Sequence, residues 1–129
     1  MFTIEQITSA HAKVKSGSDF PNYARDLIQL GVRYYETHVA DGQTDYYGED
    51  NHKVAGPPKY DGFVIAPTPL VDQFKADLMA HQQGKTDYPT FVADCARSGI
   101  EKWVVSMEKR TCSYYDSDNN ILVVEPILT

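Results

Sequence analysis

Residues 32–49 decide the fold, and they read VRYYETHVADGQTDYYGE. β-Branched and aromatic residues on both sides of the Asp41-Gly42 dipeptide are typical of two strands, predicted here over residues 32–40 and 43–49. Asp-Gly is a strong signal for a two-residue type I′ hairpin turn. With this turn, His38 is expected to lie directly opposite Asp45.

Side chains alternate along a strand, so the hairpin has two faces of different character. The first face is apolar and is expected to lie under helices. It carries Tyr35, Thr37, Val39, Thr44 and Tyr46. The second face is polar and aromatic, and is expected to be solvated or to form a site. It carries Tyr34, Glu36, His38, Asp45, Tyr47 and Glu49.

The rest of the chain alternates helix signals with strand signals. Thr3 and Gln6 predict a capping box for a first helix that ends at Gly17, and Asp19 begins a second helix that Gly31 ends. A loop is predicted over residues 51–60, followed by a short third strand over residues 62–66. Helices are expected over residues 69–84 and 87–99, and strands over residues 100–108, 111–116 and 121–128.

The sequence also repeats itself after a shift of 68 positions. Asp19-Phe20-Pro21 falls on Asp87-Tyr88-Pro89, and Tyr46-Tyr47 falls on Tyr114-Tyr115. We therefore predict one α+β domain over residues 1–129, built by internal duplication of an ααβββ unit with pseudo-repeats at about 3–66 and 69–128. Its antiparallel sheet should carry the helices packed on one face.

The repeat extends the two faces into the second half of the chain. The apolar face gains Trp103, Val105, Met107, Cys112 and Tyr114. The polar face gains Lys102, Val104, Ser106, Ser113, Tyr115 and Ser117. We expect Tyr35, Val39, Trp103, Val105 and Met107 to be buried, and Glu36, His38 and Lys102 to remain accessible.

The polar face holds the candidate ligand-binding residues, which are Glu36, His38, Asp45, Tyr47 and Tyr115. A carboxylate beside an imidazole can orient it as a general base, although an exposed ion pair of a few tenths of a kcal/mol explains the same residues. The same face offers two other arrangements. Ser106 and Ser113 could join His38 and Asp45 in a Ser/His/Asp set, but no nucleophile-elbow pattern accompanies them.

Glu36, His38 and Asp45, with His52, are also the residues most suited to ligate a metal ion. They lack a His-x-His or His-Glu-x-x-His signature. The sequence therefore predicts no metal, no cofactor and no assigned catalytic residue.

Charge and cysteine content narrow the class of partner. Twelve basic residues against eighteen acidic ones give a net charge of −6 without a basic run, so binding to nucleic acid is not expected. The longest aliphatic run, residues 121–124, is far shorter than the ~20 residues of a membrane span, and the N-terminus lacks a signal-peptide pattern. Two cysteines fit a reducing compartment, so we expect a cytoplasmic protein that does not enter a membrane.

Several stretches resemble one known family along essentially the whole chain. They include Asp19-Phe20-Pro21, Val39-Ala40-Asp41-Gly42, His81-Gln82-Gln83-Gly84, Gly99-Ile100-Glu101-Lys102-Trp103 and Thr111-Cys112-Ser113-Tyr114-Tyr115-Asp116. The pattern resembles the YbcV-like family of small enterobacterial and prophage-borne proteins of unknown function, some of which carry the label phage envelope protein. The resemblance implies a cytoplasmic, phage-derived domain and brings no catalytic residues.

Two function classes follow from these observations. The first is a non-enzymatic accessory or binding protein that acts through a protein surface. The alternative is a small-molecule-binding protein or enzyme that uses the polar face around His38 and Asp45. Because residues 121–125 are apolar on both sides of a predicted strand, a second subunit is one candidate to cover them, and a homodimer is expected.

Overall fold

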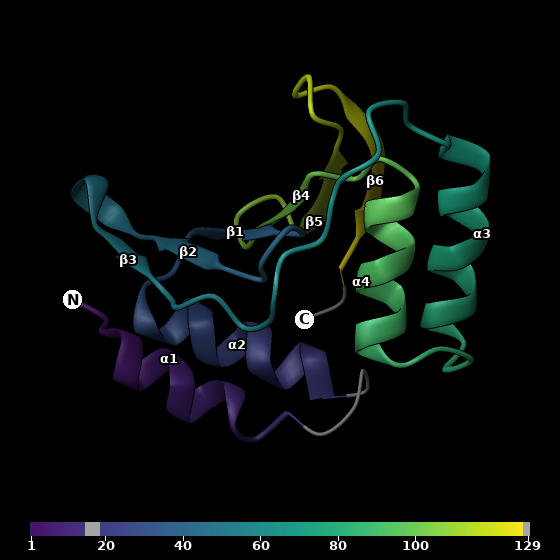
Figure 1. The fold of residues 1–129 in the computed structure, drawn as a ribbon. Helices are drawn as coiled ribbons and strands as arrows, with labels where there is room; N and C mark the ends of the chain where they lie inside the picture. Colours follow the sequence, from purple (N-terminus) through teal and green to yellow (C-terminus); the bar gives the residue numbers. More distant parts are fainter. Residues whose placement is uncertain (15–18, 128–129) are drawn as a thin grey trace.

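The computed structural model describes residues 1–14 and 19–127. The six strands of these residues form one antiparallel sheet, which four α-helices accompany (Figure 1). In chain order the elements are α1 (Ile4–His11), α2 (Phe20–Leu30), β1 (Tyr34–His38), β2 (Thr44–Tyr47), the 3-10 helix η2 (Glu49–Asn51), β3 (Lys53–Ala55), α3 (Val71–Gln82), α4 (Tyr88–Arg97), β4 (Lys102–Ser106), β5 (Thr111–Tyr115) and β6 (Ile121–Pro126). The α+β class is confirmed. Gly17 and Leu128, expected to end the first helix and the last strand, lie outside the described residues.

The predicted caps of α1 and α4 are confirmed, whereas α3 begins at Val71, two residues after its predicted start. The Thr3 hydroxyl accepts a hydrogen bond from the Gln6 backbone N–H, and the Gln6 side chain accepts one from the Thr3 N–H, which completes the capping box of α1. At α4, the Asp87 carboxylate accepts from the Thr90 N–H. Gly31 follows α2 with a left-handed backbone, φ 98°.

The strand order β3-β2-β1-β4-β5-β6 places the two hairpins side by side. Their contact is the antiparallel pair β1–β4, in which Glu36 lies opposite Val104 and His38 lies opposite Lys102. The strand β3 forms one edge of the sheet and β6 forms the other. The central strands therefore come one from each half of the chain.

The loop between β1 and β2 differs from the predicted two-residue turn. It contains residues 39–42, with Thr37 opposite Thr44 and the His38 N–H donating to the Gln43 carbonyl. The Ala40 carbonyl, which a two-residue turn would bond to Gln43, accepts from the Phe63 N–H instead, at 2.7 Å. The pairing is shifted by two residues, so the two faces of the hairpin keep their predicted membership.

The predicted third strand over residues 62–66 was wrong, as was the loop assigned to residues 53–55. The turn η2 reverses the chain directly after β2, and β3 pairs with β2 through Tyr46 opposite Val54. Residues 62–66 instead hydrogen-bond to the β1–β2 loop and to α4. The Phe63 N–H donates to the Ala40 carbonyl, and the Ala66 N–H donates to the Ala96 carbonyl at 2.9 Å. Their backbone donors are used by tertiary contacts and not by the sheet.

The helices pack against the predicted apolar face of the sheet. The Tyr23 hydroxyl of α2 lies 3.5 Å from that of Tyr46, and the Phe91 ring of α4 packs on Trp103. The Phe74 ring of α3 contacts Tyr114 at 4.9 Å between centroids. The expected core residues Tyr35, Val39, Trp103, Val105 and Met107 are all buried, and Glu36, His38 and Lys102 are not. The opposite face of the sheet is open.

Cys95 and Cys112 are free and buried within this core. Burial raises the pKa of the Cys95 thiol strongly and that of the Cys112 thiol to about 12. Burial also raises the pKa of Tyr23 and Tyr35. In the described part of the chain, no helix is both long enough and apolar enough to span a membrane.

Gly99 should tolerate a methyl group far less well than Gly84. Both have left-handed backbones, φ 81° and 77°, but a Cβ at Gly99 would lie 2.9 Å from Pro69 Cα, whereas a Cβ at Gly84 meets nothing within 4 Å. We expect Gly84→Ala to cost about 1–2 kcal/mol of unfolding free energy, and Gly99→Ala to cost clearly more. Urea unfolding measures both, and equal losses would contradict the close approach.

Because the Cys112 thiol is buried, we expect the free energy of unfolding to fall in alkaline solution. In the unfolded chain Cys112 deprotonates near its ordinary pKa, whereas in the folded protein it stays neutral up to about 12. Stability from this group is therefore complete below about pH 8.5 and falls as the pH rises above it, by about 1.4 kcal/mol per pH unit. Urea midpoints between pH 7 and 10.5 should fall less steeply in Cys112→Ala than in the wild type, and parallel profiles would argue against the assignment.

Candidate functional site

Three rows of side chains cross the open face of the sheet. The strand register defines them. The first row is Lys53, Tyr47, Tyr34, Ser106, Thr111 and Pro126; the second is Ala55, Asp45, Glu36, Val104, Ser113 and Val124; the third is His38, Lys102, Tyr115 and Ile121. Charged groups gather at the β1–β2 end of these rows, and apolar groups gather at the β6 end.

Glu36, His38 and Asp45 form a compact cluster at the charged end. One donor atom from each lies within 4.8 Å of the others. His38 Nε2 is 3.3 Å from Asp45 Oδ2, so the predicted contact exists. It is a diagonal contact, because Glu36 and not His38 lies directly opposite Asp45. Asp45 is only 8% exposed, whereas Glu36 and His38 are half-buried.

Two lysines lie beside these carboxylates. Lys102 Nζ is 3.8 Å from Glu36 Oε1, and Lys53 Nζ is 4.0 Å from Asp45 Oδ2. The Gln43 side chain donates to Asp45 Oδ1 at 3.5 Å. The lysines partly offset the repulsion between two carboxylates placed opposite each other on neighbouring strands.

Aromatic rings flank the cluster. Tyr34 and Tyr47 stack with their centroids 4.5 Å apart and an interplanar angle of 11°. Lys53 lies over the Tyr47 ring and Lys102 lies 5.0 Å from the centre of the Tyr115 ring. The pKa of Tyr47 is raised, first by partial burial and then by the negative charge of Glu36, against the opposing effect of Lys53.

The structure brings four of the five sequence-predicted site residues together, namely Glu36, His38, Asp45 and Tyr47. Tyr115 lies farther along the third row, with Lys102 between it and His38. The two lysines and Gln43 were not among the predicted site residues. The repeat placed Lys102 on the polar face, but its position beside Glu36 follows from the β1–β4 pairing, which no local pattern encodes.

Ser106, Ser113 and His52 lie away from the His38–Asp45 pair. Ser106 is opposite Tyr34, at the other end of the β1–β4 pair from His38. Ser113 is opposite Val104, so it does not adjoin Asp45. His52 is engaged by the N-terminal segment, because its Nε2 lies 2.8 Å from the Phe2 carbonyl oxygen. No Ser/His/Asp set is assembled by these residues.

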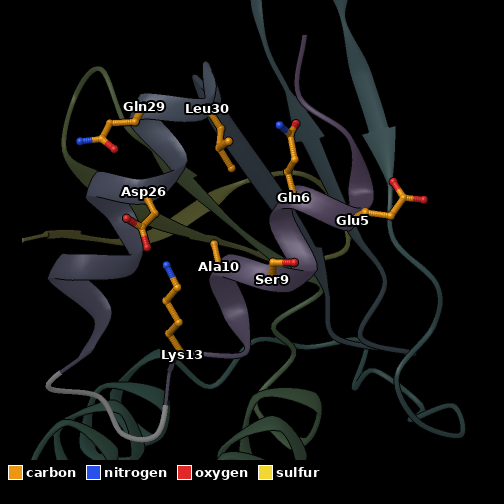
Figure 2. A pocket seen from close by; sticks show the side chains of 8 residues that line it. All are labelled: Glu5, Gln6, Ser9, Ala10, Lys13, Asp26, Gln29 and Leu30. Atoms are coloured by element: carbon orange, nitrogen blue, oxygen red, sulfur yellow. The ribbon is translucent and has the colours of Figure 1, made fainter.

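A separate groove of about 570 Å³ lies between α1 and α2. Figure 2 shows its lining, in which the Lys13 side chain points toward Asp26 while Gln6 and Leu30 lie at the other end. It is wide open and lined mostly by exposed polar side chains. It contains none of the predicted site residues.

Comparison with known proteins places the chain in a family. A model of a protein family of unknown function, DUF1398, matches residues 8–126. The chain belongs to this family. Uncharacterised proteins of Mycobacterium bovis and Mycobacterium tuberculosis are each 34% identical to it over 102 residues, which cover 74% of this chain and 59% of those relatives. The chain thus spans about three-fifths of the length of these mycobacterial relatives.

The contact between Lys102 and Glu36 should be measurable in a double-mutant cycle. Lys102→Gln leaves Glu36 opposite Asp45 without its cation, and we expect a loss of about 0.5 kcal/mol of unfolding free energy. In a Glu36→Gln background the same substitution should cost close to nothing. The exposed pair of Arg33 and Glu49, at 3.5 Å, is the matched control and should show almost no coupling. Equal coupling in both pairs would contradict a partly desolvated cluster.

Proposed function

We propose that this member of the DUF1398 family is a non-enzymatic accessory or binding protein whose binding surface is the open face of the sheet. The proposal rests on two exposed apolar side chains at the β6 end of this face. Ile121 and Val124 are 55% and 54% exposed. They project from the side of the sheet opposite the helices, because they pair with Tyr115 and Ser113 of that face. The helices of the same chain leave them uncovered.

A second copy of this chain fits the apolar end of the face. Val124 lies opposite Ser113, with Val104 next in the same row, and none of these three side chains is ionisable; Lys102 lies farther away, beyond Tyr115 in the third row. Two copies related by a twofold axis can therefore meet there without burying like charges. Pro126 lacks a backbone donor, which favours contact between faces over pairing along the β6 edge.

The nucleophilic side chains support a role in binding over a role in catalysis. Both thiols are buried, and their raised pKa values keep them in the poorly nucleophilic protonated form. Ser106 and Ser113 lie away from the His38–Asp45 pair. The free thiols also support a cytoplasmic location. A prophage-associated role rests on the resemblance to the YbcV-like proteins.

We also infer that the two halves arose by duplication. The strands β1 and β4 begin 68 residues apart, as do α2 with α4 and β3 with β6. Glu36 and Val104, which are equivalent under this shift, are paired with each other in the sheet. Close backbone superposition of residues 19–51 on residues 87–119 is the expected result, and a poor fit would count against duplication.

A small-molecule site is the second candidate function, favoured by the cluster at the charged end. Glu36, His38 and Asp45 adjoin the stacked Tyr34 and Tyr47 rings. A planar or cationic ligand would find both an aromatic surface and carboxylates there. Charge substitutions at β6 would leave such a site intact, which separates the two candidates.

Self-association should depend on Val124. We expect light scattering at micromolar concentration to give about twice the chain mass of 14.5 kDa for the wild type and the chain mass for Val124→Lys, because an ammonium group in an apolar interface must be desolvated. Val64, 92% exposed in the segment after β3, is the matched control, and Val64→Lys should remain dimeric. A monomeric wild type, or an unaffected Val124→Lys, would refute the proposed interface.

A further inference from the structure

We infer that Glu36, His38 and Asp45 form a binding site for a divalent first-row transition-metal ion such as Zn²⁺. The three residues come from adjacent strands, β1 and β2, and their side chains project from the open face. This inference does not depend on association through β6, because the cluster lies at the opposite end of the same face.

The spacing of the donor atoms supports the site. Two ligands of a Zn²⁺ ion bound at about 2.0–2.2 Å lie about 3.0–3.5 Å apart. His38 Nε2 and Asp45 Oδ2 are separated by 3.3 Å, which already falls within this range. All three donor atoms lie within 4.8 Å of one another, so a small rotation of the Glu36 side chain would complete the set. Glu36 carries the longer of the two carboxylate side chains.

The electrostatics of the cluster favour a cation. Glu36 and Asp45 lie opposite each other, and Asp45 is largely removed from water. The nearest ammonium groups are 3.8 Å and 4.0 Å away, beyond hydrogen-bond distance from the oxygens that they face. An ion held directly between the carboxylates would neutralise them more effectively than these lysines do.

The mixture of ligands indicates the class of ion. Imidazole nitrogen suits zinc, nickel, copper and iron, whereas calcium and magnesium prefer oxygen ligands. Three protein ligands on an open face leave coordination positions for water. Gln43 donates to the second oxygen of Asp45 and would orient that carboxylate.

The sequence already identifies Glu36, His38 and Asp45 as candidate ligands, but it predicts no metal because the three residues match no linear metal-binding motif. Glu36 and His38 are two positions apart on one strand, and Asp45 joins them only through the pairing of β1 with β2. The four-residue loop sets that register. It places Asp45 opposite Glu36 and diagonal to His38, so all three can face one point.

Isothermal titration with Zn²⁺ alone, at neutral pH, tests the site. We expect one ion per chain, with at least about tenfold weaker binding in His38→Gln, Asp45→Asn and Glu36→Gln. Two matched controls remove the same groups elsewhere. His11→Gln deletes an exposed imidazole on α1, and Glu49→Gln deletes an exposed carboxylate after β2. Both controls should bind Zn²⁺ within about twofold of the wild type.

Three further measurements test the competing lysine, the ion selectivity and the histidine ligand. Lys102→Met should strengthen Zn²⁺ binding severalfold, since it removes the cation that competes for Glu36. Mg²⁺ and Ca²⁺ should bind at least about 100-fold more weakly than Zn²⁺. In NMR spectra, the ring nitrogen signals of His38 should shift on addition of Zn²⁺, while those of His52 should not.

The outcomes that overturn the inference are specific. No binding at 1 mM Zn²⁺ would refute it, and so would binding that survives both His38→Gln and Asp45→Asn with circular dichroism spectra unchanged. Val124→Lys should bind Zn²⁺ like the wild type, and His38→Gln should keep the wild-type mass in light scattering. The site and the self-association surface can therefore fail independently.

Discussion

The antiparallel pairing of β1 with β4 is the interaction on which the rest of the structure depends. It is the contact that joins the first hairpin to the second within one sheet. Backbone bonds extend it at both ends, from Val39 N–H to the Glu101 carbonyl and from Met107 N–H to the Arg33 carbonyl. Because the pairing keeps the side-chain alternation in phase, the apolar faces of both hairpins become one surface, which the helices cover.

The same pairing determines the composition of the open face. It places Lys102 beside Glu36 and opposite His38, so a positive charge from the second half of the chain meets the acidic cluster of the first. It also places uncharged side chains of β4, β5 and β6 at the other end. One face thus has a charged end suited to ions and an apolar end suited to a protein surface.

Much of the architecture can be predicted from local sequence. Thr3, Asp87 and Gly31 mark helix boundaries through capping and left-handed geometry, which depend on residues close in the chain. Alternation around Glu36 and His38 assigns both hairpin faces, and the predicted core residues are buried. The third strand was predicted in the wrong place because residues 62–66 have the composition of a strand. Their backbone N–H groups instead donate hydrogen bonds to a loop and to the end of a helix.

The sequence by itself determined the helix caps, the two faces of the sheet and the membership of the polar cluster, because each depends on interactions between residues a few positions apart. Only the tertiary structure decided the register of β1 with β2. The Ala40 carbonyl bonds to Phe63, and the Tyr60 hydroxyl donates to the Val39 carbonyl. With these bonds to a distant segment, the loop around Asp41-Gly42 contains four residues instead of the predicted two. Asp45 therefore lies opposite Glu36, and the geometry of the cluster follows from contacts that no local pattern contains.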